Sequence, residues 1–196
     1  GGLALFIVPT NAPGVLRSTF VAIDGSGGAD ISFTDVALAP EQLLGGQGGS
    51  QISSPTGKLA GSGSGKQGVT GGGVLPALHA AIDDAILAIG AEALGAMQSL
   101  LDATVEYTKT REQFGQAIGK FQALQHAMAD MYMKVEETRS LVINAAIALD
   151  ENDGSAPEAC AALKVKVAEA GRIVSQQAVQ LHGGIGMTDE LGIGHF

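Results

Sequence analysis

The chain has few positive charges, and this scarcity excludes one class of partner. Its 196 residues include 11 Lys and Arg against 20 Asp and Glu, for a net charge of −9. Binding to nucleic acid needs a basic face that neutralises phosphates, so we predict that no nucleic acid is bound. A nucleotide ligand stays compatible with this charge, because it needs only a local anion site.

Cysteine and long apolar runs are scarce as well. Cys160 is the single cysteine, so no disulfide can form within the chain, and the lone thiol fits a reducing compartment. We expect Cys160 to be a small core residue on a helix and the protein to be cytoplasmic. No apolar run reaches the roughly 18 residues of a membrane span. We therefore predict no membrane span, and we predict no metal site.

Aromatic residues are scarce too. Trp is absent and aromatic residues make up 4% of the chain. Hydrophobic residues make up 45% and charged residues 16%, which indicates a globular chain. Abundant Ala and Leu favour helix packed on helix over a β-sandwich. The predicted fold class is mainly α: an antiparallel four-helix-bundle C-terminal domain, preceded by a partial β-domain of a few strands.

Residues 1–44 are predicted to form the partial β-domain. Residues 3–8 are a short apolar run typical of a buried strand, and residues 31–36 alternate in a way that predicts a half-buried strand. Two or three strands are too few for an independent core, so we expect them to complete a sheet with other strands. Residues 45–73 are rich in Gly and Ser, which predicts a flexible linker. Their Gly–Lys pairs lack the spacing of a phosphate-binding loop.

Residues 74–196 are predicted to form the helical bundle domain. Apolar residues recur at three- and four-residue steps in three stretches, each typical of a long amphipathic helix. The stretches are residues 78–107, 121–149 and 163–181. A break at 152–154 precedes the third helix, Pro157 suits its first turn, and Gly183-Gly184 ends it. A fourth helix is expected to begin near Met187.

The connection between the first two helices carries an unusual set of side chains. A solvated turn needs only polar residues, whereas this one combines an arginine, amides, an aromatic ring and glycines. They are Arg111, Gln113, Phe114, Gly115, Gly119 and Gln122. Arginine presents a planar fork of donors suited to phosphate or pyrophosphate, and glycine permits a close approach of backbone to a ligand. The alternative is a tight turn with a surface arginine.

A second unusual segment, residues 180–190, follows the third helix. It has three glycines in four positions, where backbone N–H groups can line a ligand. The alternative is a helix cap followed by a loop. His182 and His195 are interpreted as helix-end histidines with satisfied hydrogen bonds, and a functional role for them is left open.

Together, these segments resemble the two signatures of the acyl-CoA dehydrogenase family. The resemblance rests on YTKTREQFG at 107–115, on IGKFQALQ at 118–125 and on QLHGGIG at 180–186, which lie at a matching separation. Residues 4–8 and 33–36 resemble the end of the family's middle β-domain. The resemblance covers nearly the whole chain except the Gly- and Ser-rich stretch.

The resemblance implies a fold, a cofactor and a reaction. The family has an N-terminal helical domain, a middle β-domain and a C-terminal four-helix bundle, with FAD between domains and across a subunit boundary. The implied reaction is α,β-dehydrogenation of an acyl-CoA thioester, in which a carboxylate removes the α-proton and the β-hydrogen leaves as hydride. An electron-accepting flavoprotein would take the electrons, and the subunits would form a homo- or hetero-oligomer.

The resemblance also implies two sets of FAD contacts. The residues expected at the pyrophosphate and adenosine side are Arg111, Gln113 and Phe114. The residues expected to approach the same FAD from a neighbouring subunit are Gln122, Gln180, Gly183 and Gly184.

The chain departs from the family pattern where the catalytic base is expected. The usual Glu would lie beyond Phe196, so the catalytic residue stays unassigned. We expect a fragment truncated at both ends, which alone would hold little flavin. Asp83 and Asp84 lie near an alternative base position, but we interpret them as a solvated helix face. Ile86 stands where the family typically carries a substrate-contacting Arg.

Residues 187–190 are most similar to subunits of heteromeric bacterial acyl-CoA dehydrogenases. Two alternatives therefore accompany the prediction of an FAD-dependent acyl-CoA dehydrogenase. One is a non-catalytic subunit that completes an FAD site or serves as a scaffold in a heteromeric enzyme. The other is a plain helical bundle without a nucleotide site.

Overall fold

The computed structural model describes residues 4–22, 25–44, 74–151, 154–188 and 190–195. The predicted linker at 45–73 and the predicted break at 152–153 lie outside the described residues. The chain divides into two compact units, Gly1–Leu78 and His79–Phe196. The boundary therefore falls within the first turn of the first long helix, a few residues beyond the predicted boundary at residue 74.

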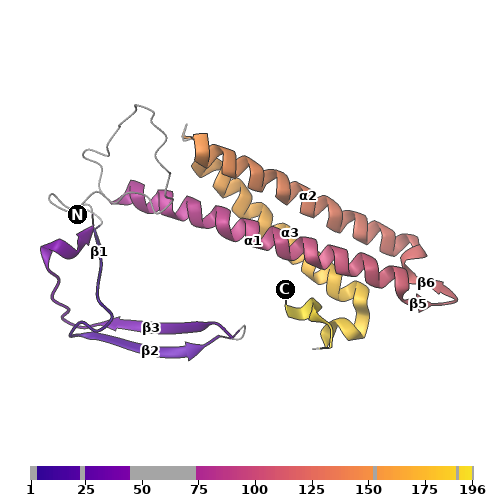
Figure 1. The fold of residues 1–196 in the computed structure, drawn as a ribbon, viewed down its shortest axis with the longest axis horizontal. Coiled ribbons are helices and arrows are strands. Elements are labelled where there is room, and N and C mark those ends of the chain that lie inside the picture. The colour runs from indigo at the N-terminus through magenta and orange to yellow at the C-terminus, as the bar shows by residue number, and fades with distance from the viewer. Residues whose placement is uncertain (1–3, 23–24, 45–73, 152–153, 189, 196) are drawn as a thin grey trace. The chain divides into compact units, whose positions relative to one another are not determined.

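The first unit consists of two small antiparallel β-ribbons (Figure 1). Strand β1 (Leu5–Phe6) pairs with β4 (Leu43–Leu44), and β2 (Val15–Val21) pairs with β3 (Gly27–Phe33) from one end to the other. Sequence reasoning did not identify β2. The predicted strand at 31–36 is real but begins earlier and ends at Phe33.

Burial in this unit differs from the prediction for the strand at 31–36. Its apolar side chains were expected to be half-buried, yet Ile31 is 48% exposed and Phe33 61% exposed. On the paired strand, Leu16 and Val21 are exposed as well. The reason is that a two-stranded ribbon has no second layer against which to bury either face.

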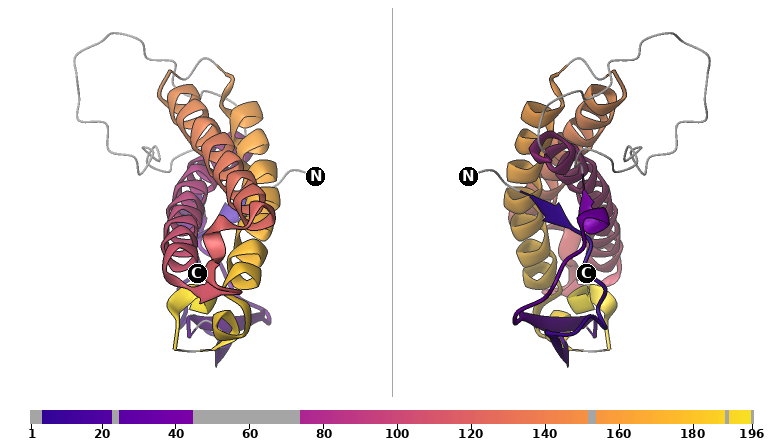
Figure 2. Two further views of the ribbon diagram at one scale, coloured as in Figure 1. Left: turned by 90° about the vertical axis from the view of Figure 1, so that its right-hand side faces the viewer. Right: turned by 90° about the vertical axis from the view of Figure 1, so that its left-hand side faces the viewer.

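The second unit is built on three long antiparallel helices, which lie side by side (Figures 1 and 2). They are α1 (Leu75–Thr110), α2 (Gln122–Glu151) and α3 (Ala156–His182). Pro157 stands in the first turn of α3, and Gly183 ends α3 with a φ of 66°. The predicted mainly helical fold class is confirmed, with three of its helices in the described residues.

The end of the chain is less regular than predicted. Residues Gly183–Met187 (η3) and Gly192–His195 (η4) form short 3-10 turns. In the described stretch after Met187, the expected fourth helix is thus represented only by the four residues of η4. Among the helices of the described residues, none combines the length and apolarity that a membrane crossing requires.

The helical core has two parts along the bundle. The first lies toward the α1–α2 connection, and its buried members are Met97, Leu100, Leu101, Met131, Val135, Ala170, Val174, Ala178, Leu181 and Ile193. The second lies toward the opposite end and contains Ala145, Ala148, Ala159, Cys160 and Leu163. In this second part α1 and α3 approach closely, since a Cβ built on Gly90 would lie 2.8 Å from Leu163 Cδ2.

Cys160 is a core residue of α3, as predicted. It has no exposed surface, and its thiol Sγ donates to the Asp83 carbonyl oxygen at 3.6 Å. Burial raises the pKa of the Cys160 thiol, and the carboxylates of Asp83 and Asp84 raise it further. The thiol is therefore held in its unreactive, protonated form.

Candidate functional site

The connection between α1 and α2 is a two-residue β-hairpin. Strand β5 (Glu112–Gln113) pairs with β6 (Gln116–Ala117), and the two residues between them both have positive φ, 54° at Phe114 and 79° at Gly115. Positive φ at both central positions defines the turn type that best matches the twist of paired strands. The hairpin is closed at its base by a bond from Ile118 N–H to the Arg111 carbonyl at 2.8 Å.

Phe114 lies at the tip of this hairpin in an unfavourable backbone conformation. A left-handed backbone conformation costs a residue other than glycine about 1–2 kcal/mol, and Asn or Gly is the usual choice at this position. The Phe114 ring is 91% exposed and makes one edge-on contact, to Phe121 at 6.1 Å between centroids. An exposed aromatic ring on a strained backbone motivates the hypothesis of a function.

Arg111 stands at the base of the same hairpin and is exposed. Its N–H donates to the Tyr107 carbonyl at 2.8 Å, which continues the pattern of α1 by one residue. The nearby Glu106 carboxylate is paired with Lys109. Among the described residues the Arg111 guanidinium has no hydrogen-bond or ion-pair partner. Its planar fork of donors is therefore available to an anion.

Two features below the hairpin hold it against the helices. A Cβ on Gly119 would lie 3.0 Å from the Thr108 carbonyl oxygen, so only glycine permits this approach. The Gln125 side-chain amide donates to the Gly119 carbonyl at 2.9 Å. Thr108 is buried and its hydroxyl donates to the Val105 carbonyl at 2.9 Å. Gly119 is therefore needed for packing, and Gln125 and Thr108 were not identified as supports from the sequence.

The end of α3 forms the second part of the site. Gln180, Gly183 and Gly184 are exposed, and the Gly183 N–H bonds back to the carbonyls of α3. Gly186 lies under them, because a Cβ there would come within 2.9 Å of His182 Cβ and 3.0 Å of the Val179 carbonyl. The turn η3 is thus folded closely onto the helix end, with the exposed glycines outward.

A direct contact joins the hairpin end of α1 to the end of α3. The Tyr107 hydroxyl donates to the His182 carbonyl at 3.3 Å, and the two rings stack with centroids 4.4 Å apart and planes 27° apart. His182 is 4% exposed, and its Nδ1 lies 2.8 Å from the Ala178 carbonyl. His182 is thus a helix-end histidine with a satisfied hydrogen bond, as interpreted from the sequence.

The structure brings the predicted cofactor residues to one end of the helical unit (Figure 1). All seven are exposed there, on the hairpin, at the start of α2 and at the end of α3. They are Arg111, Gln113, Phe114, Gln122, Gln180, Gly183 and Gly184. Asp83 and Asp84 are not part of this group, since they lie in the first turns of α1 near Cys160.

The sequence of the helical unit matches a known family. Residues 72–196 match the family model "Acyl-CoA dehydrogenase, C-terminal domain". The chain belongs to the acyl-CoA dehydrogenase family. Over 194 residues it is 34% identical to a probable acyl-CoA dehydrogenase of Bacillus subtilis, YngJ, covering 97% of this chain and 44% of YngJ. Over 108 residues it is 44% identical to the acyl-CoA dehydrogenase IpdE2 of Mycolicibacterium smegmatis, covering 55% of this chain and 33% of IpdE2.

Solved structures with the same fold include an acyl-CoA dehydrogenase. Butyryl-CoA dehydrogenase from Megasphaera elsdenii superposes with a TM-score of 0.76 at 26% identity, covering 98% of this chain and 44% of that one. A structure of PigA with FAD and proline superposes with a TM-score of 0.80 at 25% identity, over 98% of this chain and 44% of PigA. The chain spans less than half the length of these relatives and solved structures.

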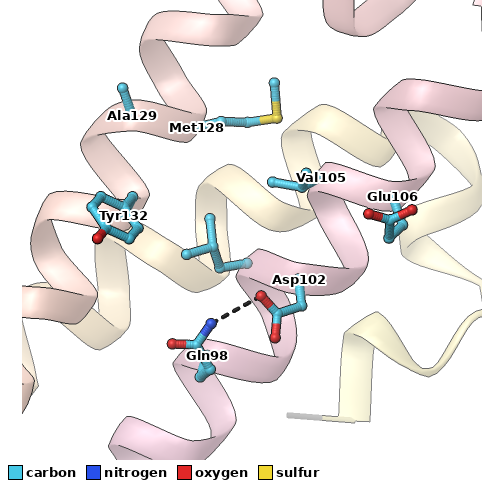
Figure 3. Close-up of a pocket in the computed structure, with 8 residues that line it drawn as sticks. Gln98, Asp102, Val105, Glu106, Met128, Ala129 and Tyr132 are labelled. Atoms are coloured by element: carbon cyan, nitrogen blue, oxygen red, sulfur yellow. Dashed lines mark hydrogen bonds between the residues drawn. The ribbon is translucent and has the colours of Figure 1, made fainter.

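A groove between α1 and α2 lies beside the cofactor residues but has a different character (Figure 3). Its volume is about 450 Å³, and it is lined by Gln98, Leu101, Asp102, Val105, Glu106, Met128, Ala129 and Tyr132. The Gln98 amide donates to Asp102 Oδ1 at 2.9 Å. Because its ionisable lining consists of carboxylates and a phenol, this groove does not suit a phosphate group.

Proposed function

We propose that the protein is an FAD-dependent acyl-CoA dehydrogenase and that this chain supplies residues for the dinucleotide half of its FAD site. One observation carries the proposal. Arg111 and Phe114 are both exposed on the hairpin, the Arg111 guanidinium has no partner among the described residues, and Phe114 is held at a positive φ. A residue that served only the turn would be Asn or Gly there. Family membership makes FAD the natural ligand for this arrangement.

The residues present fit the chemistry of a flavin dinucleotide. The Arg111 fork suits a pyrophosphate, and the Phe114 ring offers a flat apolar face to an adenine or ribose. The side-chain amides of Gln113, Gln122 and Gln180 can hydrogen-bond to the nucleotide. Exposed glycines let backbone approach the ligand without hindrance, and the two concerned are Gly183 and Gly184.

Both segments lie at one end of one helical unit and touch through Tyr107 and His182. We therefore propose that they serve one FAD together from the same chain. This differs from the division between two subunits that the sequence resemblance implied. The dinucleotide could still reach a second subunit with its flavin half, which is compatible with a homo- or hetero-oligomer.

When bound, FAD supplies the hydride acceptor for α,β-dehydrogenation of an acyl-CoA thioester. The residues of this chain bind and orient the nucleotide half, and none of the seven is placed in a proton-transfer role. A carboxylate is needed to remove the α-proton, and its identity stays open. Asp83 and Asp84, which were expected on a solvated helix face, are half-buried on α1 near Cys160, and no role is assigned to them. An electron-accepting flavoprotein is the proposed partner that reoxidises the flavin.

A second candidate is a subunit that completes an FAD site without catalysing turnover itself. Two solved structures whose names pair two proteins support it: a variant of the steroid ACAD Tcur3481-Tcur3483, at 27% identity and a TM-score of 0.72, and the ChsE4-ChsE5 complex of Mycobacterium tuberculosis, at 25% and 0.75. This candidate predicts that acyl-CoA bleaches the flavin only when a partner subunit is co-expressed. Bleaching by the separately purified protein would contradict it.

The proposed function is tested first at Arg111. Arg111→Ala is expected to weaken FAD binding about tenfold or more, because a charge-assisted hydrogen bond contributes about 1.5–3 kcal/mol. Arg111→Lys keeps the charge but removes the fork, and should fall between the parent and the alanine variant. The measurement is a titration of apoprotein with FAD followed by flavin fluorescence.

Lys109→Ala provides the matched control for this experiment. Lys109 lies two residues before Arg111 and is an exposed cation paired with Glu106. If a general positive field attracted the dinucleotide, removing either cation would weaken binding to a similar extent. We expect Lys109→Ala to bind FAD as the parent does. Equal FAD affinity in Arg111→Ala and the parent would overturn the proposed function.

A further inference from the structure

His182 makes contacts with three parts of the helical unit at once. Its ring stacks on Tyr107 of α1, its Nδ1 bonds to the Ala178 carbonyl of α3, and its Cβ lies under Gly186 of η3. The side chain is 4% exposed, so it cannot itself touch a dinucleotide that approaches from solvent. Its role must therefore act through the residues that it holds.

The contacts of His182 fix the orientation of its ring. The Ala178 carbonyl can only accept a hydrogen bond, so Nδ1 at 2.8 Å carries the proton. This bond sets the ring plane, and Tyr107 then stacks on one face of the ring at 4.4 Å. In return, the Tyr107 hydroxyl donates to the His182 carbonyl, which is one of the last carbonyls of α3 and lacks a partner within the helix.

The Tyr107–His182 contact lies next to both candidate binding segments in the sequence. Tyr107 lies one helical turn before Arg111 and accepts a hydrogen bond from the Arg111 N–H. His182 directly precedes Gly183, where α3 ends. A change in the Tyr107–His182 contact would therefore shift the hairpin relative to the glycine turn. Both candidate binding segments depend on the same pair of side chains for their mutual position.

We infer that Tyr107 and His182 are positioning residues that hold the hairpin and the end of α3 at the separation a single dinucleotide requires. The inference rests on the proposed function. His182 is too buried to touch the ligand, and the role inferred for Tyr107 needs no contact with it. The pair instead holds the two segments in position before FAD arrives. Less conformational entropy is then lost on binding, because the site is already formed.

The test is a titration of apoprotein with FAD for three variants. His182→Ala removes the stack and the Nδ1 bond and should weaken FAD binding about tenfold. His182→Phe keeps a ring for the stack and should recover part of that loss. Tyr107→Phe removes only the hydroxyl bond and should weaken binding about threefold. Because Tyr107→Phe changes a single atom, it keeps the test valid if His182→Ala does not fold.

A role in positioning is separated from a role in stability by a control at the far end of the bundle. Gly90→Ala is expected to lower the melting temperature through its clash with Leu163 but to leave the FAD Kd unchanged. The double variant Tyr107→Phe/His182→Ala should bind FAD more weakly than either single variant, because the hydroxyl bond ends on the backbone carbonyl of residue 182 and survives His182→Ala, whereas the ring stack survives Tyr107→Phe. A parent-like FAD Kd in both His182→Ala and Tyr107→Phe would overturn the inference. A parent-like Kd in Arg111→Ala would instead overturn the proposed function.

Discussion

At the scale of single residues, the backbone conformation of Phe114 could not be inferred from the sequence motif around it. The pattern around Arg111 indicated a ligand, and the side chains that it singled out are exposed. The pattern did not predict the left-handed conformation of Phe114, because Phe strongly disfavours positive φ. Asn is the residue usually found before Gly in such a turn. The departure from turn preference is itself the signal, and it becomes visible only in the structure, where the φ of Phe114 is 54°.

Phe114→Asn should stabilise the protein while weakening its cofactor binding. Asn tolerates the left-handed conformation, so the free energy of unfolding should rise by about 0.5–1 kcal/mol after loss of the contact to Phe121. FAD binding should weaken about threefold to tenfold with the ring removed. Denaturant unfolding and FAD titration measure the two effects separately.

Phe114→Ala is the matched control, because it removes the same ring without relieving the backbone. Both variants should lose FAD affinity to the same extent, and only the Asn variant should gain stability. If the two unfolded at the same denaturant concentration, the strain assigned to Phe114 would be wrong.

At the scale of elements, the helices were predictable and their contacts were not. Apolar spacing located α1 and α2 to within three residues of their ends, because each helix buries one stripe, whereas the start of α3 was indicated by Pro157 and lies seven residues before its apolar stretch. Strand β2 was missed because its side chains do not face a core that would impose alternation. The Tyr107–His182 contact joins positions 75 residues apart, and periodicity within one helix has no information about such a pair.

The approach of α1 to α3 at Gly90 provides a prediction on helix packing. Alanine at Gly90 would place its Cβ 2.8 Å from Leu163 Cδ2, and Leu163 has no exposed surface into which to turn. We expect Gly90→Ala to lower the free energy of unfolding by about 1 kcal/mol, since overpacking costs roughly 1–3 kcal/mol and helix propensity returns part of it. Thermal unfolding followed by circular dichroism measures the change.

Gly95→Ala is the control on the same helix. A Cβ at Gly95 meets no atom within 4 Å, so the gain in helix propensity of about 0.5–1 kcal/mol should appear undiminished. Opposite signs for the two substitutions are the expected result. A gain in stability for Gly90→Ala would show that Leu163 yields to the added methyl group.

At the scale of the whole molecule, the sequence predicted a partial β-domain, a linker and a helical domain, and the structure divides the chain into two compact units. The prediction that residues 1–44 lack an independent core agrees with the exposure of Ile31 and Phe33. Charge was harder to interpret. The net charge of −9 argues against nucleic acid as a partner, but composition could not show that four charges on α2 and α3 alternate in sign across the helix pair.

These four charges form one network on the helical unit. Lys134 pairs with Glu169 at 3.0 Å and with Glu137 at 3.3 Å, and Lys166 pairs with Glu137 at 3.0 Å and with Glu169 at 3.4 Å. Hydrogen bonds to the lysines lower the pKa of Glu137 and of Glu169, and the same bonds raise the pKa of Lys134 and of Lys166. Each ion therefore stabilises the folded state only while it is charged.

The helical unit should accordingly be most stable between the acid and alkaline limits of this network. The two glutamates contribute above their usual pKa of 4.5, and their contribution is lost as the pH falls below that value. The two lysines contribute below their usual pKa of 10.5, and theirs is lost as the pH rises through the raised value. The raised pKa of Cys160 acts in the same alkaline direction, because the unfolded thiol ionises first. Melting temperature measured against pH should fall on both sides.

Glu137→Gln/Glu169→Gln isolates the acid side of this profile. The double variant should melt at a lower temperature than the parent at neutral pH, and the two should converge as the pH falls below 4.5. The difference should shrink with added salt, since these carboxylates are nearly half exposed. Glu92→Gln, an exposed position on α1, is the control and should parallel the parent at every pH. A constant difference between the double variant and the parent from neutral pH into acid would mean that the network does not couple protonation to folding.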